Sequence, residues 1–373
     1  MLLDNDVMES IAARVRAAAA ADAPLRIRGG GSKDFYGEAL LGEVLDTTSL
    51  AGIVSYEPSE LVVTAGAGTK LAELETLLAS HGQCLPFEPP HFSAGGTVGG
   101  MVASGLSGPA RASVGAVRDY VLGLKLLNGK GEHLTFGGQV MKNVAGYDVS
   151  RLMVGAMGTL GLLTEISLKV LPVAPLEATL HFECSQHQAL DWLNAWGAQP
   201  LPLNASCWVQ DKGVGTLYLR LRGAQAAVEA ACKTLGDNFG GRQSQNPAVL
   251  ADWQACRNQQ LPWFQERRLE QDLWRLSVPQ TTPVLDLPDS PLMEWHGGQR
   301  WVRAAAEHAQ HLRGLAAKAG GSATLFIAGD GRASKAQGRF DVIKPPLDRI
   351  HRDLKREFDP AGIFNRGRMS AHW

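Results

Sequence analysis

Three clusters of glycine and other small residues in the first half of the chain restrict the fold more than any other feature. They are RGGGS at residues 28–32, GGTVGGMVASGLSG at residues 95–108 and GAMGTLG at residues 155–161. Glycine loses much conformational freedom on folding, so a run of glycines predicts a demanding turn or a close approach of the backbone to a partner. Successive backbone N–H groups can also form a concavity that binds an anion. For RGGGS taken alone, a surface turn and a phosphate-binding loop both remain open.

The distribution of glycine and tryptophan divides the chain into two parts. Of the 42 glycines, 25 lie in residues 1–170, whereas all nine tryptophans lie after residue 190. The first part is therefore suited to close backbone contact and the second to the packing of bulky side chains. A length of 373 residues is sufficient for two domains. The stretch LPVAPLE, residues 171–177, marks the expected boundary.

Composition and charge argue against several classes of function. A formal net charge of -1 gives no basic surplus for binding nucleic acid. The N-terminus begins with acidic residues and is typical of an amphipathic helix rather than a signal peptide, and no apolar run is long enough to span a bilayer. The five cysteines are too widely spaced for CxxC metal or iron–sulfur ligation, which predicts reduced thiols in a cytoplasmic protein. These cysteines are Cys84, Cys184, Cys207, Cys232 and Cys256.

Hydrophobic periodicity predicts both helices and strands. In the first part we expect strands at LVVTAG and LLTEISLKVLP, a helix at TKLAELETLLASHG, and a hairpin at DYVLGLKLLNGKGEHLTF that turns at Asn128 and Gly129. In the second part, strands at ATLHFEC, SCWVQ, TLYLRLRG and SATLFIAG alternate with helices at residues 186–196, 224–236 and 303–320. Such interleaving predicts an antiparallel sheet with helices on one face.

Two nucleotide-binding patterns are incomplete. The stretch VVTAGAGTKLAELE resembles the strand, turn and helix of a dinucleotide fold, but Leu71 occupies the position at which GxGxxG requires its third glycine. The pattern GxxxxGK[ST] of nucleotide hydrolases is absent. A structural turn is the better interpretation of Gly66 and Gly68.

The second glycine cluster is more unusual. The small residues from Ser93 to Gly108 would allow a long backbone path to lie flat against a ligand and would offer many N–H donors. The alternative is a tightly packed entry into a helix. Three clusters within one half of the chain imply a large, elongated ligand with a phosphate portion.

The order of four motifs is similar to that of a known family. RGGGS is followed by GGTVGGMVASGLSG with RASVGAVRDYVLG, then by MKNVAGYDVSRLMVGAMGTLGLLTEISLKVLP, and finally by FDPAGIFNRGRM. This order resembles the FAD-binding proteins of the vanillyl-alcohol oxidase type, and among them the FAD-binding E subunits of bacterial glycolate oxidases, whose short length and KNVAGYD segment the chain shares. The resemblance covers residues 25–172 and the last fifteen residues strongly, and the middle in outline.

The resemblance implies an α+β flavoprotein with three parts. A two-subdomain FAD-binding domain would occupy residues 1–172, an antiparallel-sheet cap domain residues 173–335, and a C-terminal segment, residues 336–373, would return to the first domain. Relatives that bind FAD covalently often carry a histidine after the first glycines. This chain has Ser32 and Lys33 there, so non-covalent FAD is expected.

The resemblance also implies which residues hold FAD. Those expected at the pyrophosphate are Gly29, Gly30, Gly31, Ser32 and Lys33. Those expected along the flavin and its ribityl chain are Gly96, Thr97, Gly99, Gly100, Ser104 and Gly105. Those expected near the isoalloxazine are Arg111, Ser113 and Gly115, and near the adenine half Gly158, Thr159, Gly161 and Leu163. In the C-terminal segment that returns to the flavin, the matching residues are Asn365 and Arg368.

One departure from related proteins bears on catalysis. Related metal-dependent 2-hydroxyacid dehydrogenases have a segment like HAGDGNLH, whose histidines bind a metal near the substrate. The corresponding stretch here is IAGDGRAS, which places Ile327 and Ser334 at the histidine positions, and neither side chain can replace an imidazole ligand. The sequence therefore assigns no metal site and no catalytic residue, and we do not expect substrate oxidation by this chain alone.

The resemblance implies one favoured function and two alternatives. The favoured function is an FAD-carrying glycolate oxidase subunit that takes part in oxidising glycolate to glyoxylate. Because the chain has no iron–sulfur pattern, it would pass electrons to partners, namely a second FAD-binding subunit and an iron–sulfur subunit. The alternatives are a stand-alone FAD-dependent 2-hydroxyacid dehydrogenase and a mainly structural FAD-containing subunit. We expect a cytoplasmic protein, and association with the inner face of the membrane through partners stays open.

Overall fold

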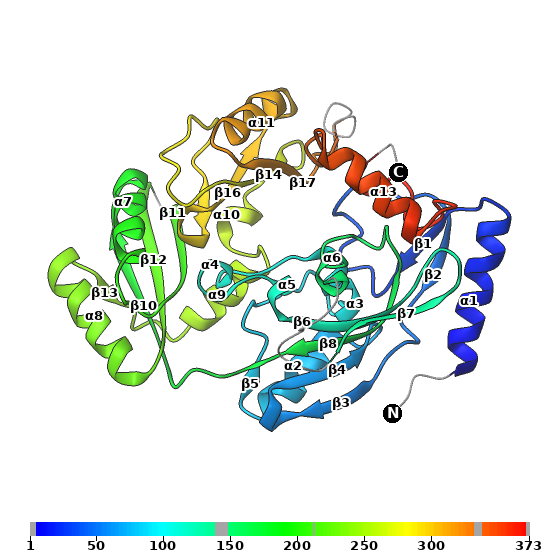
Figure 1. Ribbon diagram of the computed structural model, residues 1–373. Coiled ribbons are helices and arrows are strands. Elements are labelled where there is room, and N and C mark those ends of the chain that lie inside the picture. Colours follow the sequence, from blue (N-terminus) through cyan, green and yellow to red (C-terminus); the bar gives the residue numbers. More distant parts are fainter. Residues whose placement is uncertain (1–4, 139–147, 212, 332–337, 371–373) are drawn as a thin grey trace. The chain divides into compact units, whose positions relative to one another are not determined.

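The computed structural model describes residues 5–138, 148–211, 213–331 and 338–370. The chain forms two compact units (Figure 1). Unit 1 consists of Met1–Leu106, Ala116–Val173 and Val342–Trp373, and unit 2 consists of Ser107–Gly115 and Ala174–Asp341. The chain thus leaves unit 1 twice and returns to it at its C-terminal end.

Unit 1 is built on a five-stranded sheet in which each neighbouring pair of strands is antiparallel. The strands, in spatial order, are β3 (Ile53–Glu57), β4 (Val62–Gly66), β8 (Leu162–Lys169), β6 (Val121–Leu127) and β7 (His133–Gly137). The three central strands are largely buried because they are rich in Val, Leu and Ile. The predicted hairpin is confirmed, since the Asn128 side chain accepts the backbone N–H groups of Lys130 and Glu132 at its turn.

Short helices share the core of this sheet. They are α2 (Leu71–Ser80), α3 (Val98–Ser104) and α5 (Val117–Tyr120). Apolar residues recur along α2 at Leu71, Leu74 and Leu78, which places them on one helical face, and all three are buried. Smaller elements of unit 1 are η1 (Pro58–Glu60), β5 (Gln83–Cys84), α6 (Val149–Leu152) and β9 (Leu171–Pro172).

A second, smaller layer of unit 1 brings together the first described helix and strands and part of the C-terminal segment. Strands β1 (Leu25–Arg28) and β2 (Glu43–Asp46) pair in parallel, and helix α1 (Asn5–Ala20) packs on them. Parallel strands need a long connection, and here residues 29–42, which contain the first glycine cluster, supply it. The C-terminal segment joins β1, because Leu25 N–H donates to Ile363 O and Asn365 N–H donates to Leu25 O.

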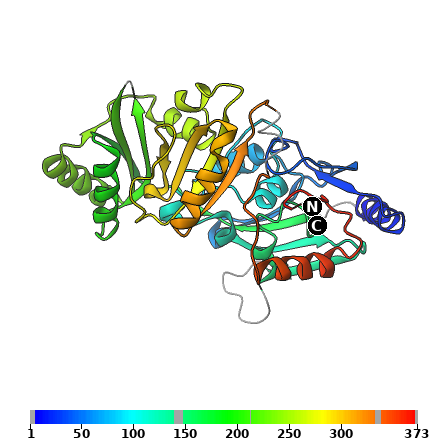
Figure 2. The same cartoon turned by 90° about the horizontal axis from the view of Figure 1, so that it is seen from above.

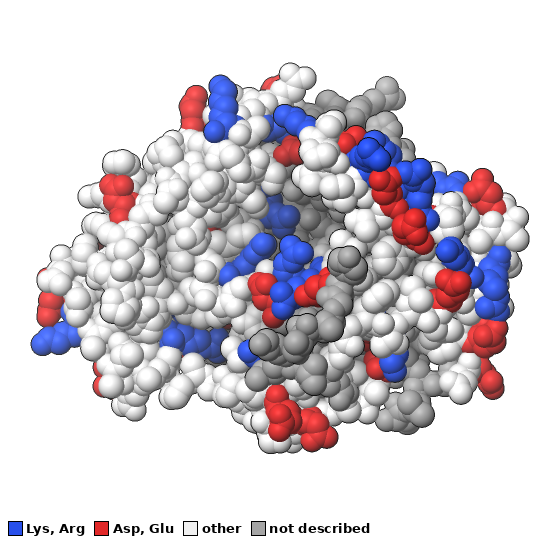
Figure 3. Space-filling model, viewed as in Figure 1, with Lys and Arg blue, Asp and Glu red and all other residues white. Residues whose placement is uncertain are grey.

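Helix α13 (Leu347–Phe358) precedes this C-terminal return. Its outer surface carries both signs of charge, as Figure 3 shows for the face in view. Ion pairs one turn apart join Arg349 to Asp353 and Arg352 to Asp348. Among the described residues, no helix is both long and apolar enough to cross a bilayer.

Unit 2 contains an eight-stranded antiparallel sheet. The strands, in spatial order, are β13 (Arg242–Gln243), β10 (Leu176–Glu183), β12 (Val214–Gly223), β11 (Leu203–Asp211), β15 (Leu292–Glu294), β16 (Gln299–Ala304), β14 (Asp272–Ser277) and β17 (Ser322–Ile327). The further elements of unit 2 are α4 (Arg111–Val114), η2 (Trp295–Gly297) and η3 (Ala306–His308).

Helices lie on both faces of this sheet (Figure 2). On one face are α7 (Gln186–Gly197), α8 (Gln225–Phe239) and α11 (Ala309–Lys318), and on the other α9 (Val249–Arg257) and α10 (Pro262–Gln265). Leu180 packs with α7 and α8, whereas its neighbour Thr179 accepts a hydrogen bond from the indole of Trp253 in α9 at 2.9 Å. Because successive strand residues point to opposite faces, α9 lies on the second face. The prediction of helices on one face was therefore incomplete.

The helix predicted at residues 303–320 begins later than expected. Arg303 and Ala304 pair with Leu273 and Asp272 in the sheet, so α11 starts only at Ala309. The apolar pattern of the segment is typical of a helix, but its first residues pair with a neighbouring strand instead. Ser334 and most of the KNVAGYD segment lie outside the described residues.

Candidate functional site

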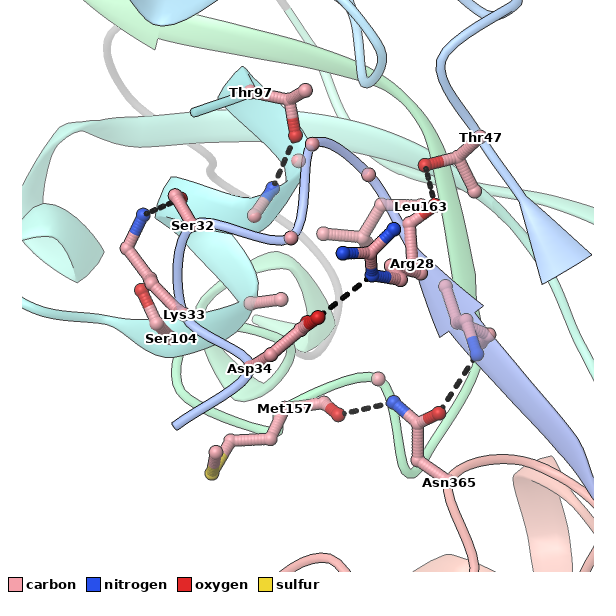
Figure 4. A pocket seen from close by; sticks show the side chains of 18 of the residues that line it. Arg28, Ser32, Lys33, Asp34, Thr47, Thr97, Ser104, Met157, Leu163 and Asn365 are labelled. Carbon is pink, nitrogen blue, oxygen red and sulfur yellow. Dashed lines mark hydrogen bonds and ion pairs between the residues drawn. The ribbon is translucent and has the colours of Figure 1, made fainter. Parts of the chain in front are cut away.

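A narrow slot in unit 1 gathers residues from four parts of the chain (Figure 4). It encloses about 120 Å³, well below the roughly 300–1,000 Å³ of most small-molecule pockets, so it can hold only part of an extended ligand. Its walls come from β1 and the loop after it, from α3, from the turn before β8 and from the C-terminal segment. The lining residues are Ile27, Arg28, Gly29, Gly30, Gly31, Ser32, Lys33, Asp34, Tyr36, Leu40, Thr47, Ala67, Thr97, Gly99, Gly100, Ala103, Ser104, Met157, Gly158, Gly161, Leu163, Asn365 and Arg368.

The loop after β1 presents a row of backbone donors. Within the described part of the chain, the N–H groups of Gly30, Gly31, Ser32 and Lys33 donate to no acceptor. Gly31 has a φ of +71°, in the left-handed region that L side chains rarely adopt. Successive N–H groups around such a residue form a concavity that suits an anion.

The packing of the chain on itself also requires the glycines of this loop. A Cβ atom on Gly30 would lie 1.5 Å from the carbonyl oxygen of Gly95, and one on Gly29 would lie 2.5 Å from Oγ1 of Thr97. Both distances are too short for any side chain. RGGGS is thus a demanding turn whatever it binds, and its unused N–H groups add the features of an anion-binding loop.

Lys33 contributes a positive charge to the slot. The ammonium group lies 3.3 Å from the Ser32 hydroxyl and 5.8 Å from the ring centre of Phe92. Partial burial lowers the pKa of Lys33 to about 8. Within the described residues no carboxylate pairs with Lys33, so the slot offers an anion a cation that is already partly desolvated.

Helix α3 forms a wall whose N–H groups are already used. Gly99 N–H donates to Ala67 O at 2.8 Å, and Gly100 N–H donates to the hydroxyl of its N-cap residue, Thr97, at 3.1 Å. A Cβ atom on Gly99 would lie 2.8 Å from Cβ of Ala67. The expectation of many free donors along the second glycine cluster is therefore wrong at these positions. Glycine is needed there because α3 packs closely against the end of β4.

Asn365 clamps two walls of the slot together. Its side-chain oxygen accepts the backbone N–H of Ile27 at 2.8 Å, and its amide nitrogen donates to the carbonyl oxygen of Met157 at 2.7 Å (Figure 4). Gly158 has a φ of +71°, and a Cβ atom on it would lie 2.6 Å from the same amide nitrogen. Asn365 thus fixes the distance between β1 and the turn at Gly158.

Arg368 holds the loop after β1 from the C-terminal side. Its guanidinium donates to the carbonyl oxygens of Lys33 at 3.0 Å and Glu38 at 2.8 Å. These bonds fix the ends of the segment that carries Lys33. Arg368 therefore acts on the loop's backbone as well as lining the slot.

The structure brings most of the predicted site residues into this slot, but not all of them. Gly96 and Gly105 flank α3, and Gly105 ends it with a φ of +62°. Thr159 is 1% exposed and donates its hydroxyl to Ala156 O. The predicted residues that do not line the slot are Gly96, Gly105, Thr159, Arg111, Ser113 and Gly115. The last three belong to unit 2.

Comparison with known proteins agrees with this picture of unit 1. Residues 6–137 match a family model described as an FAD binding domain. Over 371 residues the chain is 45% identical to glycolate oxidase subunit GlcE of Escherichia coli (strain K12), a match that covers 100% of this chain and 99% of that subunit. The chain belongs to the GlcE family. Its residues 6–137 carry an FAD-binding domain.

More distant proteins match the GlcE-family chain in part. A D-lactate dehydrogenase of Archaeoglobus fulgidus is 31% identical over 166 residues, which covers 44% of this chain and 37% of that enzyme. A solved structure of alkyldihydroxyacetonephosphate synthase matches 96% of this chain and 74% of its own with a TM-score of 0.66 and 15% identity. At that identity the likeness concerns the fold, and it agrees with the predicted α+β class with an FAD-binding domain and a large antiparallel sheet.

The residues of the slot fit an FAD pyrophosphate. A pyrophosphate needs several N–H donors and a cation, and the GlcE-family chain supplies the row from Gly30 to Lys33 together with the Lys33 ammonium. Asp34 also lines the slot, but it pairs with Arg28 at 2.8 Å, which neutralises the carboxylate.

Sequence reasoning missed several lining residues, among them Arg28, Asp34 and Thr47. Opposite charges at Arg28 and Asp34 bracket GGGSK, which was a usable signal for a loop closed by an ion pair. Thr47 follows β2, and nothing in its local sequence marks it.

Neither unit shows a metal centre among its described residues. No group of three or more His, Cys, Asp and Glu side chains there is arranged to hold a metal ion. Ile327, which the family resemblance places at an expected histidine position, is the last residue of β17. The cysteines of the chain are all present as free thiols, of which Cys184, Cys207 and Cys256 are buried.

Proposed function

We propose that the chain is the FAD-carrying subunit of a glycolate oxidase and takes part in oxidising glycolate to glyoxylate. Its full-length relationship to GlcE of Escherichia coli carries this proposal. The slot supports it, because Lys33 and the neighbouring N–H groups are arranged as a dinucleotide pyrophosphate requires.

We assign the parts of FAD to this chain as follows. Gly29 to Lys33 hold the pyrophosphate, and the two walls joined by Asn365 enclose the neighbouring part of the ligand. Among the residues that the structure describes, no histidine or cysteine lines the slot, which supports non-covalent binding. The FAD-binding domain comprises residues 1–172 and is completed by the C-terminal segment. The cap lies between these two parts in the sequence.

FAD, when bound, accepts two electrons as a hydride and can release them one at a time. The residues of this chain bind and orient the cofactor, exclude water from it and set its electrostatic surroundings. Because the sequence has no iron–sulfur ligation pattern, one-electron transfer onward requires partners. We propose a second FAD-binding subunit and an iron–sulfur subunit, a cytoplasmic location, and contact with the inner face of the membrane through these partners.

The test uses the purified full-length chain, alone and together with its partner subunits. We expect a yellow protein whose FAD is released entirely into the supernatant by acid precipitation. Flavin retained by the denatured pellet would show a covalent link. We also expect that anaerobic glycolate bleaches the flavin absorbance of the assembled complex but not that of the isolated chain.

A second candidate is a stand-alone FAD-dependent 2-hydroxyacid dehydrogenase. The partial match to a D-lactate dehydrogenase favours it, although that match covers only 44% of this chain. Rapid bleaching by glycolate or D-lactate without a partner would support this candidate over the subunit. A mainly structural subunit would bind FAD yet leave turnover by the complex unchanged when the slot is emptied by mutation.

A further inference from the structure

A strained turn in unit 2 lies outside the FAD slot. Strand β15 ends at Glu294, and the next two residues, Trp295 and His296, have φ values of +54° and +55°. Gly297 follows with a φ of +91°. Two consecutive left-handed residues with large side chains are strained, because L side chains rarely adopt this backbone conformation. Surrounding contacts must hold such a turn, and strain of this kind gathers at functional sites.

The contacts of His296 are hydroxyl groups. Its Nδ1 lies 3.0 Å from the hydroxyl of Ser206, which also accepts the backbone N–H of His296 at 2.9 Å. Its Nε2 lies 3.0 Å from the hydroxyl of Ser113. His296 and Ser206 are buried, whereas Ser113 is exposed. Burial lowers the pKa of His296 to about 4, so the ring is neutral at pH 7. A neutral ring donates through one nitrogen and accepts through the other, and it thereby orients both hydroxyl groups.

Trp295, the other residue with a left-handed backbone, contacts the cationic side chain of Arg111. The guanidinium of Arg111 lies 4.5 Å from the ring centre of Trp295, and the indole N–H of Trp295 donates to Gly108 O at 2.9 Å. Arg111 and Ser113 both belong to α4, in the segment Ser107–Gly115. The strained turn therefore contacts each of the two polar side chains of α4. Trp295 stacks against Arg111, and His296 forms a hydrogen bond with Ser113.

We propose that Arg111 and Ser113 form a binding site for a small 2-hydroxy acid, with Trp295 and His296 as positioning residues. A 2-hydroxy acid carries a carboxylate and a hydroxyl on adjacent carbons. A guanidinium matches the carboxylate, and an oriented serine hydroxyl matches the neighbouring hydroxyl or the second carboxylate oxygen. The inference rests on the proposed function for its substrate class, and it concerns binding only, since no bond is broken.

A rigid site explains the strain better than a structural clamp does. A clamp between α4 and the sheet could use aliphatic side chains in relaxed backbone. Here the buried imidazole of His296 fixes the exposed hydroxyl of Ser113, and the indole of Trp295 fixes a guanidinium. Ligand sites benefit from such preorganised groups, because side chains that must become ordered on binding lose conformational freedom, and this loss lowers the affinity.

The test measures binding separately from turnover. The flavin-loaded full-length chain is labelled in its histidine rings, and the His296 signal is identified by its loss in His296→Gln. Glycolate, D-lactate and acetate are titrated in turn. We expect the His296 signal to shift with the two hydroxy acids and much less with acetate. We expect Arg111→Met to weaken glycolate binding about 30-fold and Ser113→Ala about 10-fold, with flavin content unchanged.

A matched control is Arg118→Met, which removes an exposed arginine from α5 and should leave the glycolate affinity at its wild-type value. If glycolate binds equally well to Arg111→Met, Ser113→Ala and the wild type, the proposed site is overturned. If these variants lose flavin rather than glycolate affinity, the turn serves the cofactor and the inference is wrong. If hydroxy acids shift the His296 signal but the assembled complex does not oxidise glycolate, the site stands and the proposed function falls.

Discussion

Lys355 donates to Asp359 at 2.6 Å inside unit 1, and the two side chains are 5% and 0% exposed. The same ammonium group donates to the carbonyl oxygens of Thr159 and Phe364. The Asp359 carboxylate in turn accepts the backbone N–H groups of Ile363 and Phe364. Burial lowers the pKa of Lys355, and the charge of Asp359 opposes this change. The pair therefore joins α13 and the C-terminal segment to the turn that borders the slot of unit 1.

We expect Lys355→Met to reduce the free energy of unfolding by about 3–5 kcal/mol, because it leaves the Asp359 carboxylate buried without its cation. Urea unfolding of the apo chain measures this change. Arg352→Met is the matched control, since it breaks an ion pair of the same helix that lies near the surface, and it should cost less than about 1 kcal/mol. Equal small losses in both variants would contradict the role given to the buried pair.

Two glycine variants test how closely the loop after β1 packs against the second glycine cluster. Gly30→Ala places a Cβ atom 1.5 Å from Gly95 O, so we expect a lower apo melting temperature and loss of FAD together. In Gly96→Ala the nearest atom would be the Ser32 hydroxyl at 3.5 Å, an ordinary contact, so stability and FAD content should stay near wild type. Thermal unfolding of the apo proteins and flavin absorbance of the holo proteins give both readouts. A Gly30→Ala protein with wild-type stability would mean that the loop is not packed as described.

Asn365→Asp tests the clamp between the slot walls. The aspartate can still accept the N–H of Ile27, but its second oxygen would face the carbonyl oxygen of Met157 in place of a donor. We expect FAD to bind about 10-fold more weakly, since a buried acceptor left without its donor costs about 1–3 kcal/mol. Equilibrium titration of the apo chain with FAD measures the change. Asn238→Asp, at an exposed position of α8, should leave the affinity unaltered, and an equal loss there would point to a general charge effect.

Many of the residues that meet in the slot could be named from the sequence because their signals are local. RGGGSK and the helix start at Thr97 are short motifs. Most of their glycines are required because neighbouring atoms leave no room for a Cβ atom. The C-terminal residue Asn365 lies 338 positions from Ile27, and only the resemblance to a family linked the two. The partial burial of Lys33 could not be predicted, because it depends on how distant segments pack.

The strained turn of unit 2 escaped prediction for a different reason. A left-handed backbone is usually marked by glycine or asparagine, and here Trp295 and His296 adopt it without that signal. The bond from His296 to Ser113 spans 183 positions of the chain. The free donors expected from Val98 to Gly100 are not found either. The N–H groups of Val98 and Gly99 donate to Thr69 O and Ala67 O, in a segment about thirty positions away, and the N–H of Gly100 donates to the N-cap hydroxyl of Thr97.

The pH dependence of FAD binding tests the role of Lys33. Partial burial lowers its pKa to about 8, below the ordinary value of 10.5. The apo folded state therefore binds fewer protons than the unfolded state between pH 8 and 10.5, so the contribution of Lys33 to apo stability rises with pH across that window. A bound pyrophosphate has the opposite requirement, because it favours the charged ammonium and raises the pKa of Lys33.

We therefore expect FAD affinity to be steady from pH 6.5 to about 7.5 and to fall as the pH rises through about 8. Lys33→Met should bind FAD about 10-fold or more weakly at pH 7, and its affinity should not show the fall near pH 8. Lys33→Arg should remove that fall as well, because the guanidinium keeps its proton throughout this range, while it retains part of the affinity. Fluorescence titration of the three apo proteins with FAD at fixed ionic strength measures all of these quantities. A wild-type affinity that stays constant up to pH 9, or that falls in parallel with the Lys33→Met affinity, would assign the anion-binding charge of the slot to another group.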